Sequence, residues 1–232
     1  MAVQKFGLEP IDPVPVNPSG INHSCEIPYG VEPEHIFKSL MDFVEFLGFM
    51  NRQLITKTVP RLETFLMPAA FSSLVGEFMN VRIPLFCPTV VKNRYHNGHP
   101  DLIPAGHFPN DAVQHSTVGI EVKGSRNRSG WQGHNPENVW LMVFVFDANS
   151  ANDEAEAVQK GTEPVPKPFR FVEVLGAQLE FEDWQFAGRT GASRRTITAT
   201  VKPSGYAKLA ANWIYRDPAI PPPARRRVSP AP

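Results

Sequence analysis

A run of eight apolar residues, 139–146, constrains the fold of this chain more than any other feature. A fully apolar run of this length, followed by Asp147, predicts a central β-strand that is buried on both faces. It is much shorter than the roughly 20 residues that a membrane-spanning helix needs, and no other run reaches that length. The chain is therefore expected to fold around a central sheet and to have no membrane partner.

The chain before this strand divides into an arm and a helical region. Residues 1–33 are proline-rich and aperiodic, which predicts an extended arm that wraps the domain or stays mobile. Residues 34–80 are predicted as an N-terminal helical region: one helix weakens at Gly48, a second piece covers 50–59, and a third is kinked or broken by Pro68. The first helix is predicted from apolar residues at three-and-four spacing: Ile36, Phe37, Leu40, Phe43, Val44 and Leu47.

The remainder, residues 81–216, is expected to hold the sheet. Residues 81–91 contain two prolines and predict an irregular or edge strand at best. Further strands are predicted at 169–175 and 177–186 around Gly176 and at 196–201, with a loop over 148–168 and a short helix over 204–213. The last segment, 217–232, is proline-rich and basic, and is predicted to be a disordered tail. The expected fold class is α/β (α+β), with a mixed central sheet flanked by helices.

Two short motifs carry the chemistry of this sheet. Pro100 and Asp101 precede apolar residues, so Asp101 is expected at the start of a strand. About twenty residues later, residues 117–123 alternate with period two, which predicts a strand with Glu121 and Lys123 side by side on one face. Two carboxylates beside an ammonium group suit a Mg²⁺ site, because Mg²⁺ takes one or two carboxylates and completes its octahedron with water and phosphate.

Residues 100–123 resemble the active-site hairpin of the PD-(D/E)xK nucleases, in the form Pro-Asp…Glu-x-Lys. The resemblance implies a restriction-endonuclease-like fold, with Asp101, Glu121 and Lys123 as catalytic residues. It further implies that Asp101, Glu121 and the Val122 carbonyl hold Mg²⁺. Family members often have an extra acidic residue on the helix before the first core strand, a role that falls on Glu77. The family core also has a helix before its last strand, whereas the link after Lys123 is short and rich in glycine.

Each motif also has an ordinary structural interpretation. Glu121 and Lys123 could be an exposed pair on a solvated strand, and Pro100 with Asp101 could open a turn. Glu77 could be a solvated helix glutamate. Loop histidines between residues 96 and 115 match no short zinc motif and favour solvated side chains over a zinc site.

The segment after Lys123 has the composition of a DNA-contacting loop. It contains arginine, asparagine, glutamine and serine but no acid before Pro136, and these residue types bind phosphates or read base edges. A flexible polar loop is the competing interpretation. A second acid-free stretch, residues 184–215, carries more arginines. The predicted DNA-binding residues are Ser125, Arg126, Asn127, Arg128, Gln132, His134, Asn135, Arg189, Arg194 and Arg195.

Composition limits how DNA could be bound and where the protein works. The 23 basic and 23 acidic side chains balance, so a DNA-binding surface has to be a local patch. Cys25 and Cys87 have no metal-ligand spacing and form no framework, and the first 18 residues are broken by prolines, unlike a signal peptide. The expected location is the cytoplasm.

The sequence leads to a Mg²⁺-dependent, sequence-specific endonuclease acting on double-stranded DNA, of type II restriction enzyme character. A nuclease-fold repair or junction factor, a non-catalytic DNA-binding module, and an α/β protein with an accidental motif are the alternatives. Cutting both strands suggests a homodimer, because a twofold axis places two sites on antiparallel strands. The surplus of apolar residues in the helical region suggests its interface, although core packing explains that surplus equally well: Phe37, Phe43, Phe46, Phe49 and Met50.

Overall fold

The fold was obtained as a computed structural model, which describes residues 6–133, 136–186 and 199–221. In this part of the chain a six-stranded mixed sheet has the strand order β1-β2-β3-β5-β6-β9. Only β3 and β5 run parallel; the other neighbours are antiparallel. The strands are β1 Val90–Lys92, β2 Leu102–Pro104, β3 Ile120–Ser125, β5 Val139–Asp147, β6 Arg170–Leu179 and β9 Trp213–Arg216.

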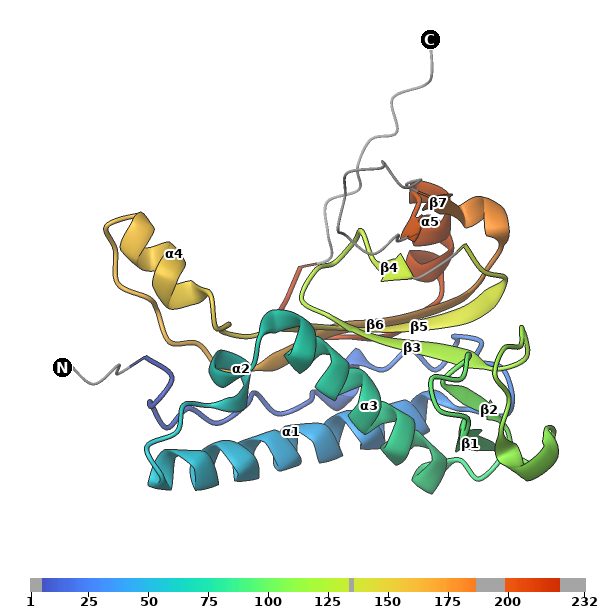
Figure 1. The fold of residues 1–232 in the computed structure, drawn as a ribbon, viewed down its shortest axis with the longest axis horizontal. Helices are drawn as coiled ribbons and strands as arrows, with labels where there is room; N and C mark the ends of the chain where they lie inside the picture. The colour runs from blue at the N-terminus through green and yellow to red at the C-terminus, as the bar shows by residue number, and fades with distance from the viewer. Residues whose placement is uncertain (1–5, 134–135, 187–198, 222–232) are drawn as a thin grey trace, which may run out of the picture.

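Helices α1 (Pro33–Thr56) and α3 (Pro68–Phe86) cover one face of this sheet, with α2 (Leu62–Phe65) between them in the chain (Figure 1). The other face carries α5 (Pro203–Ala211) and a small sheet of β4 (Gln132–Gly133), β8 (Ala199–Val201) and β7 (Trp184–Phe186). The shorter elements are η1 Pro18–Gly20, η2 Pro109–Asp111, α4 Asp153–Gln159 and η3 Phe181–Asp183. The mixed α/β class and the helix-flanked sheet are confirmed.

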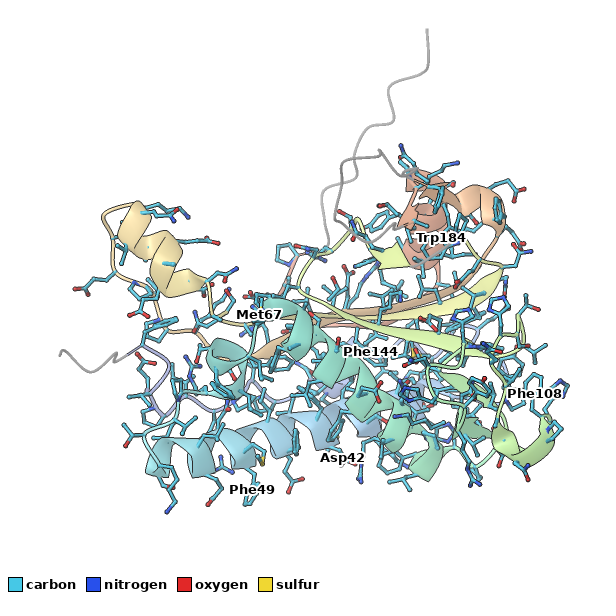
Figure 2. All side chains as sticks on the ribbon, viewed as in Figure 1. Asp42, Phe49, Met67, Phe108, Phe144 and Trp184 are labelled. Carbon is cyan, nitrogen blue, oxygen red and sulfur yellow. The ribbon has the colours of Figure 1, made fainter. Side chains whose placement is uncertain are left out.

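The apolar run of β5 is the centre of both layers. Met142, Phe144 and Phe146 pack against α1 and α3, while Leu141 and Val143 pack toward the small sheet and α5. All of β5 except Asp147 is buried, as expected for a strand covered on both faces. Figure 2 shows Phe144 at this central position and Trp184 in the upper layer. No helix in the described ranges is long and apolar enough to span a bilayer.

Several predicted element boundaries are wrong. Helix α1 is continuous through Gly48, because Leu47 and Asn51 on its buried face stay packed, and such packing outweighs the roughly 1 kcal/mol cost of one glycine. Pro68 does break the helical region, as predicted, but it does so by occupying the first turn of α3. Residues 81–86, predicted as irregular or strand, complete α3, so only Val90–Lys92 forms the edge strand.

The C-terminal half also departs from the predictions. Strand β6 runs without interruption through Gly176, where the missing side chain makes room for the ring of Trp140; a Cβ there would lie 2.1 Å from that ring. Residues 153–159, predicted as loop, form α4. The predicted end of the last helix, around Trp213, is instead the start of β9, which pairs with β6.

The two terminal segments pack on the core where they are described. In the arm, the Val14 amide donates to the Phe169 carbonyl at 2.8 Å, and Ile21 forms a bridge with Tyr215 of β9. Of the two predicted forms of the arm, wrapped on the domain or mobile, residues 6–32 therefore adopt the wrapped one. In the segment predicted as a tail, Asp217 is buried and its amide donates to the Val172 carbonyl at 2.9 Å. Residues 222–232 lie outside the described ranges.

Candidate active site

The predicted catalytic residues meet where β2 separates from β3. The only registered pair between these strands is Leu102 with Ile120, so the edge of β3 beyond that pair lacks a strand partner. Asp101, just before β2, fills the gap: its Oδ2 accepts a hydrogen bond of 2.9 Å from the Val122 amide. The motif has therefore placed a carboxylate against an open strand edge.

Glu121 and Lys123 lie side by side on one face of β3, as predicted. Their neighbours Ile120 and Val122 face the core under α1 and α3. The Lys123 Nζ lies 3.0 Å from Glu121 Oε1, and both side chains are partly buried. Register pairs them with Leu141 and Val143 of β5, so they lie on the side of the small sheet.

The two carboxylates have opposite electrostatic surroundings. Burial raises the pKa of Asp101, and the nearby charge of Glu121 adds to that effect; the Val122 amide and Lys123 offset it only in part, so the pKa reaches about 7. Burial acts in the same direction on Glu121, but His99 and Lys123 outweigh it and lower the pKa of Glu121 to about 2. The surroundings thus favour the ionised form of Glu121 and the protonated form of Asp101.

His99 and Glu137 join the site and were not among the predicted catalytic residues. His99 Nδ1 lies 2.9 Å from Glu121 Oε2, and its Nε2 lies 3.0 Å from Glu137 Oε2. Burial alone would lower the pKa of His99, but the two carboxylates raise it to about 10. The ring of His99 also stacks on His115 at 5.3 Å. His99 lay in the sequence beside Pro100, whereas nothing in the sequence could have paired it with Glu137, sixteen residues after Glu121.

His99 and Glu137 border an open hollow. It has a volume of about 340 Å³ and lies between the loop that precedes β3 and the loop that precedes β5. Of the cluster, only His99 and Glu137 are on its wall, so the hollow opens beside these two side chains. The lining residues are His99, His115, Ser116, Thr117, Pro136, Glu137, Asn138 and Phe181.

The site offers three oxygen ligands for a Mg²⁺ ion: the carboxylates of Asp101 and Glu121 and the carbonyl of Val122. The amide and carbonyl of one strand residue point to the same side, so the Val122 carbonyl faces the edge where Asp101 binds the Val122 amide. Burial, and then the charge of Glu121, raise the pKa of Asp101, and a divalent cation would offset both effects. No group of three or more His, Cys, Asp or Glu side chains with metal-binding geometry occurs among the described residues. Two carboxylates and a carbonyl would leave the other positions to water and substrate.

Glu77 lies on α3 near this edge and is tied to a different partner. Its Oε2 is 2.5 Å from Lys92 Nζ, and both side chains are exposed. Its charge contributes to the raised pKa of Asp101, but less than burial and Glu121 do. Helix α3 approaches β3 closely at Gly124, where a Cβ would lie 2.3 Å from the Ser72 carbonyl. The helix is thus fixed beside the site, with Glu77 at its border.

The loop after β3 is held by internal bonds. The Arg126 guanidinium donates to the carbonyls of Ala148 (2.6 Å) and Asn149, and it lies over the rings of Phe71 and Phe146. Burial lowers the pKa of Arg126. This arginine therefore joins the loop to the core.

Arg128 is also engaged inside the protein. Its Nε donates to Oε1 of the fully buried Glu173 at 3.0 Å, and its NH1 donates to the Pro221 carbonyl at 2.9 Å. The indole of Trp131 donates to the Asn127 carbonyl, while the Ser125 hydroxyl accepts from the Asn127 amide. Of the predicted DNA contacts in this loop, Gln132 is exposed on β4. Five further predicted DNA contacts lie outside the described residues: His134, Asn135, Arg189, Arg194 and Arg195.

Comparison with protein-family models, with curated proteins and with solved structures finds no match for this chain.

Proposed function

We propose that this chain is a Mg²⁺-dependent endonuclease of the PD-(D/E)xK type that hydrolyses phosphodiester bonds in double-stranded DNA. One observation carries the proposal: Asp101 binds the open edge of β3 at Val122, directly beside the face that holds Glu121 and Lys123. A single hairpin thus brings together two carboxylates, a backbone carbonyl and an ammonium group.

In this proposal the residues divide the work of hydrolysis. Asp101, Glu121 and the Val122 carbonyl would hold Mg²⁺, which lowers the pKa of a bound water and offsets charge on the phosphate. Lys123, 3.0 Å from Glu121, orients the attacking water and stabilises negative charge that develops on the phosphate oxygens. His99 fixes the second oxygen of Glu121 at 2.9 Å. The hollow beside His99 leaves space for a substrate strand to approach.

A non-catalytic DNA-binding module, or a repair or junction factor with this fold, is the second candidate. The charges at the site favour catalysis over that alternative. A carboxylate beside a DNA phosphate repels it unless a cation bridges the two groups, so a protein that only binds DNA gains nothing from Asp101 and Glu121.

We also propose restriction-type action by a homodimer. In the helical region, Phe43 is fully buried and Phe46 packs against the core, so core packing explains much of the apolar surplus. Phe49 and Met41 of α1 remain about half exposed, and Figure 2 shows Phe49 on the side of α1 that faces away from the sheet. Sedimentation of the free and DNA-bound protein tests the dimer: a monomer in both states would reject it without affecting the catalytic assignment.

The direct test of the function is cleavage of supercoiled plasmid DNA. The protein is expected to convert the plasmid to nicked and linear forms with Mg²⁺, and to leave it intact with EDTA. Binding without cleavage in every divalent metal would favour the non-catalytic module. Neither binding nor cleavage would reject both candidates.

A further inference from the structure

Arg94 differs from every other arginine in the described ranges, because no partner contacts its side chain. It lies in the turn between β1 and β2 and is exposed. The remaining described arginines each contact a carboxylate or a backbone carbonyl within the protein. These are Arg52 with Asp12, Arg61 with Glu63, Arg82 with Asp42, Arg126 with Ala148, Arg128 and Arg216 with Glu173, and Arg170 with Asp217.

The turn that presents Arg94 is held in place by the buried side chain of Asn93. Its Nδ2 donates to the carbonyls of Pro100 (3.0 Å) and Val113 (2.8 Å). Its Oδ1 accepts from the amides of Tyr95 (3.0 Å) and Val113 (3.1 Å). The Arg94 amide itself donates to the Asp111 carbonyl at 2.9 Å. The backbone is thus fixed while the side chains of residues 94–97 face solvent, which reduces the entropy lost on binding.

This turn lies beside the candidate active site. The Asn93 amide donates to the Asp101 carbonyl at 2.8 Å, so one hydrogen bond connects the base of the turn with the proposed metal ligand. The turn also has a favourable charge, because residues 91–100 contain no acid. Arg94 is accompanied by the neutral polar side chains of Tyr95, His96 and Asn97, all exposed.

We propose that the turn of residues 94–97 is a nucleic-acid contact, in which Arg94 binds a backbone phosphate of the DNA strand that is cut at Asp101. The inference deepens the proposed function and rests on it. A guanidinium group with free donors, on a rigid turn, matches the bidentate geometry of a phosphate group. It also supplies the local basic contact that a chain with balanced charge needs.

The experiment measures binding of a short fluorescent DNA duplex in Ca²⁺, where the strand is expected to stay uncut. Arg94→Ala is expected to lower affinity by about tenfold and to make the salt dependence shallower by about one phosphate contact. Arg94→Lys, which keeps the charge, should recover part of the loss. The matched control is Arg52→Ala at the far end of α1, which removes the same charge from an exposed pair with Asp12 (Figure 1).

The outcomes separate this inference from the proposed function. If the wild-type protein binds and cuts DNA, and Arg94→Ala binds like Arg52→Ala with an unchanged salt slope, the phosphate contact is rejected and the nuclease stands. If the wild-type protein binds no nucleic acid, both are rejected. Thermal unfolding should show all three variants folded, since neither arginine is buried.

Discussion

The Asp101 cluster and the loop that follows β3 contain similar polar residues, yet the two regions use them differently. In the loop, Arg126 donates to buried backbone carbonyls and Arg128 pairs with the buried Glu173, so both side chains are bonded inside the protein. In the cluster, Asp101 and Glu121 lie close enough for one to raise the pKa of the other. Side chains bonded inside the protein stabilise the fold, whereas two neighbouring carboxylates of like charge indicate a candidate position for a cation.

Substitutions in the Asp101 cluster should have the largest effect, and that effect should be on the rate of DNA cleavage. Asp101→Ala, Glu121→Ala and Lys123→Ala are each expected to lower the rate of plasmid cleavage by about 10³-fold, because each removes a metal ligand or the cation beside the water. Thermal unfolding checks that the fold persists. Glu45→Ala, an exposed carboxylate on α1, is the matched control and should cleave normally. Full activity of Asp101→Ala would reject the assignment.

Substitution in the loop should instead reduce stability. Arg126→Ala leaves the buried carbonyls of Ala148 and Asn149 without their donor and removes the cation over Phe71 and Phe146. We expect the free energy of unfolding in urea to fall by about 3 kcal/mol. Lys57→Ala, on the exposed end of α1, should change it by less than about 0.5 kcal/mol. An Arg126→Ala protein of normal stability that binds DNA weakly would return this arginine to the DNA interface.

The raised pKa of Asp101 predicts a specific dependence of stability on pH. Its pKa rises from 3.8 to about 7 on folding, so the folded chain binds more protons than the unfolded chain between these values. The free energy of unfolding of the metal-free protein should therefore fall as pH rises through this window. Subtracting the profile of Asp101→Asn isolates this contribution from those of Glu121 and His99. Identical profiles for the two proteins would show that Asp101 has a normal pKa.

Glu77 should give the smallest effect, because it is exposed and already paired with Lys92. Glu77→Ala is expected to change the Mg²⁺ concentration for half-maximal cleavage by less than about threefold. A tenfold or larger increase would place Glu77 among the metal ligands.

The sequence was sufficient to predict those features that depend on local pattern. Alternation along 117–123 correctly put Ile120 and Val122 in the core with Glu121 and Lys123 on the other face. The apolar run correctly predicted β5 as a buried central strand. Elements whose form depends on distant partners were not predictable: β6 passes through Gly176 because Trp140 fills the space, and β9 exists because it pairs with β6.

The same limit applies to the site. Local spacing identified Asp101, Glu121 and Lys123, but the contact of His99 with Glu137 arises only when the loop before β5 folds back. Composition also suggested DNA contacts at Arg126 and Arg128, because an arginine in an acid-free loop looks the same whether its partner is a phosphate or a backbone carbonyl. Arg94 was passed over for the opposite reason: a short polar turn carries no pattern that distinguishes a free guanidinium from a bonded one.

Calorimetric titration of the metal-free protein with Mg²⁺ near neutral pH, in buffers of different ionisation enthalpy, tests the central claim most directly. The account predicts binding with release of part of a proton from Asp101, because the metal requires the ionised carboxylate. Asp101→Asn keeps an oxygen for the Val122 amide and should bind Mg²⁺ at least about tenfold more weakly, without proton release. Absence of Mg²⁺ binding in the wild-type protein, or equal binding in both proteins, would contradict the assignment of this hairpin as a metal-dependent active site.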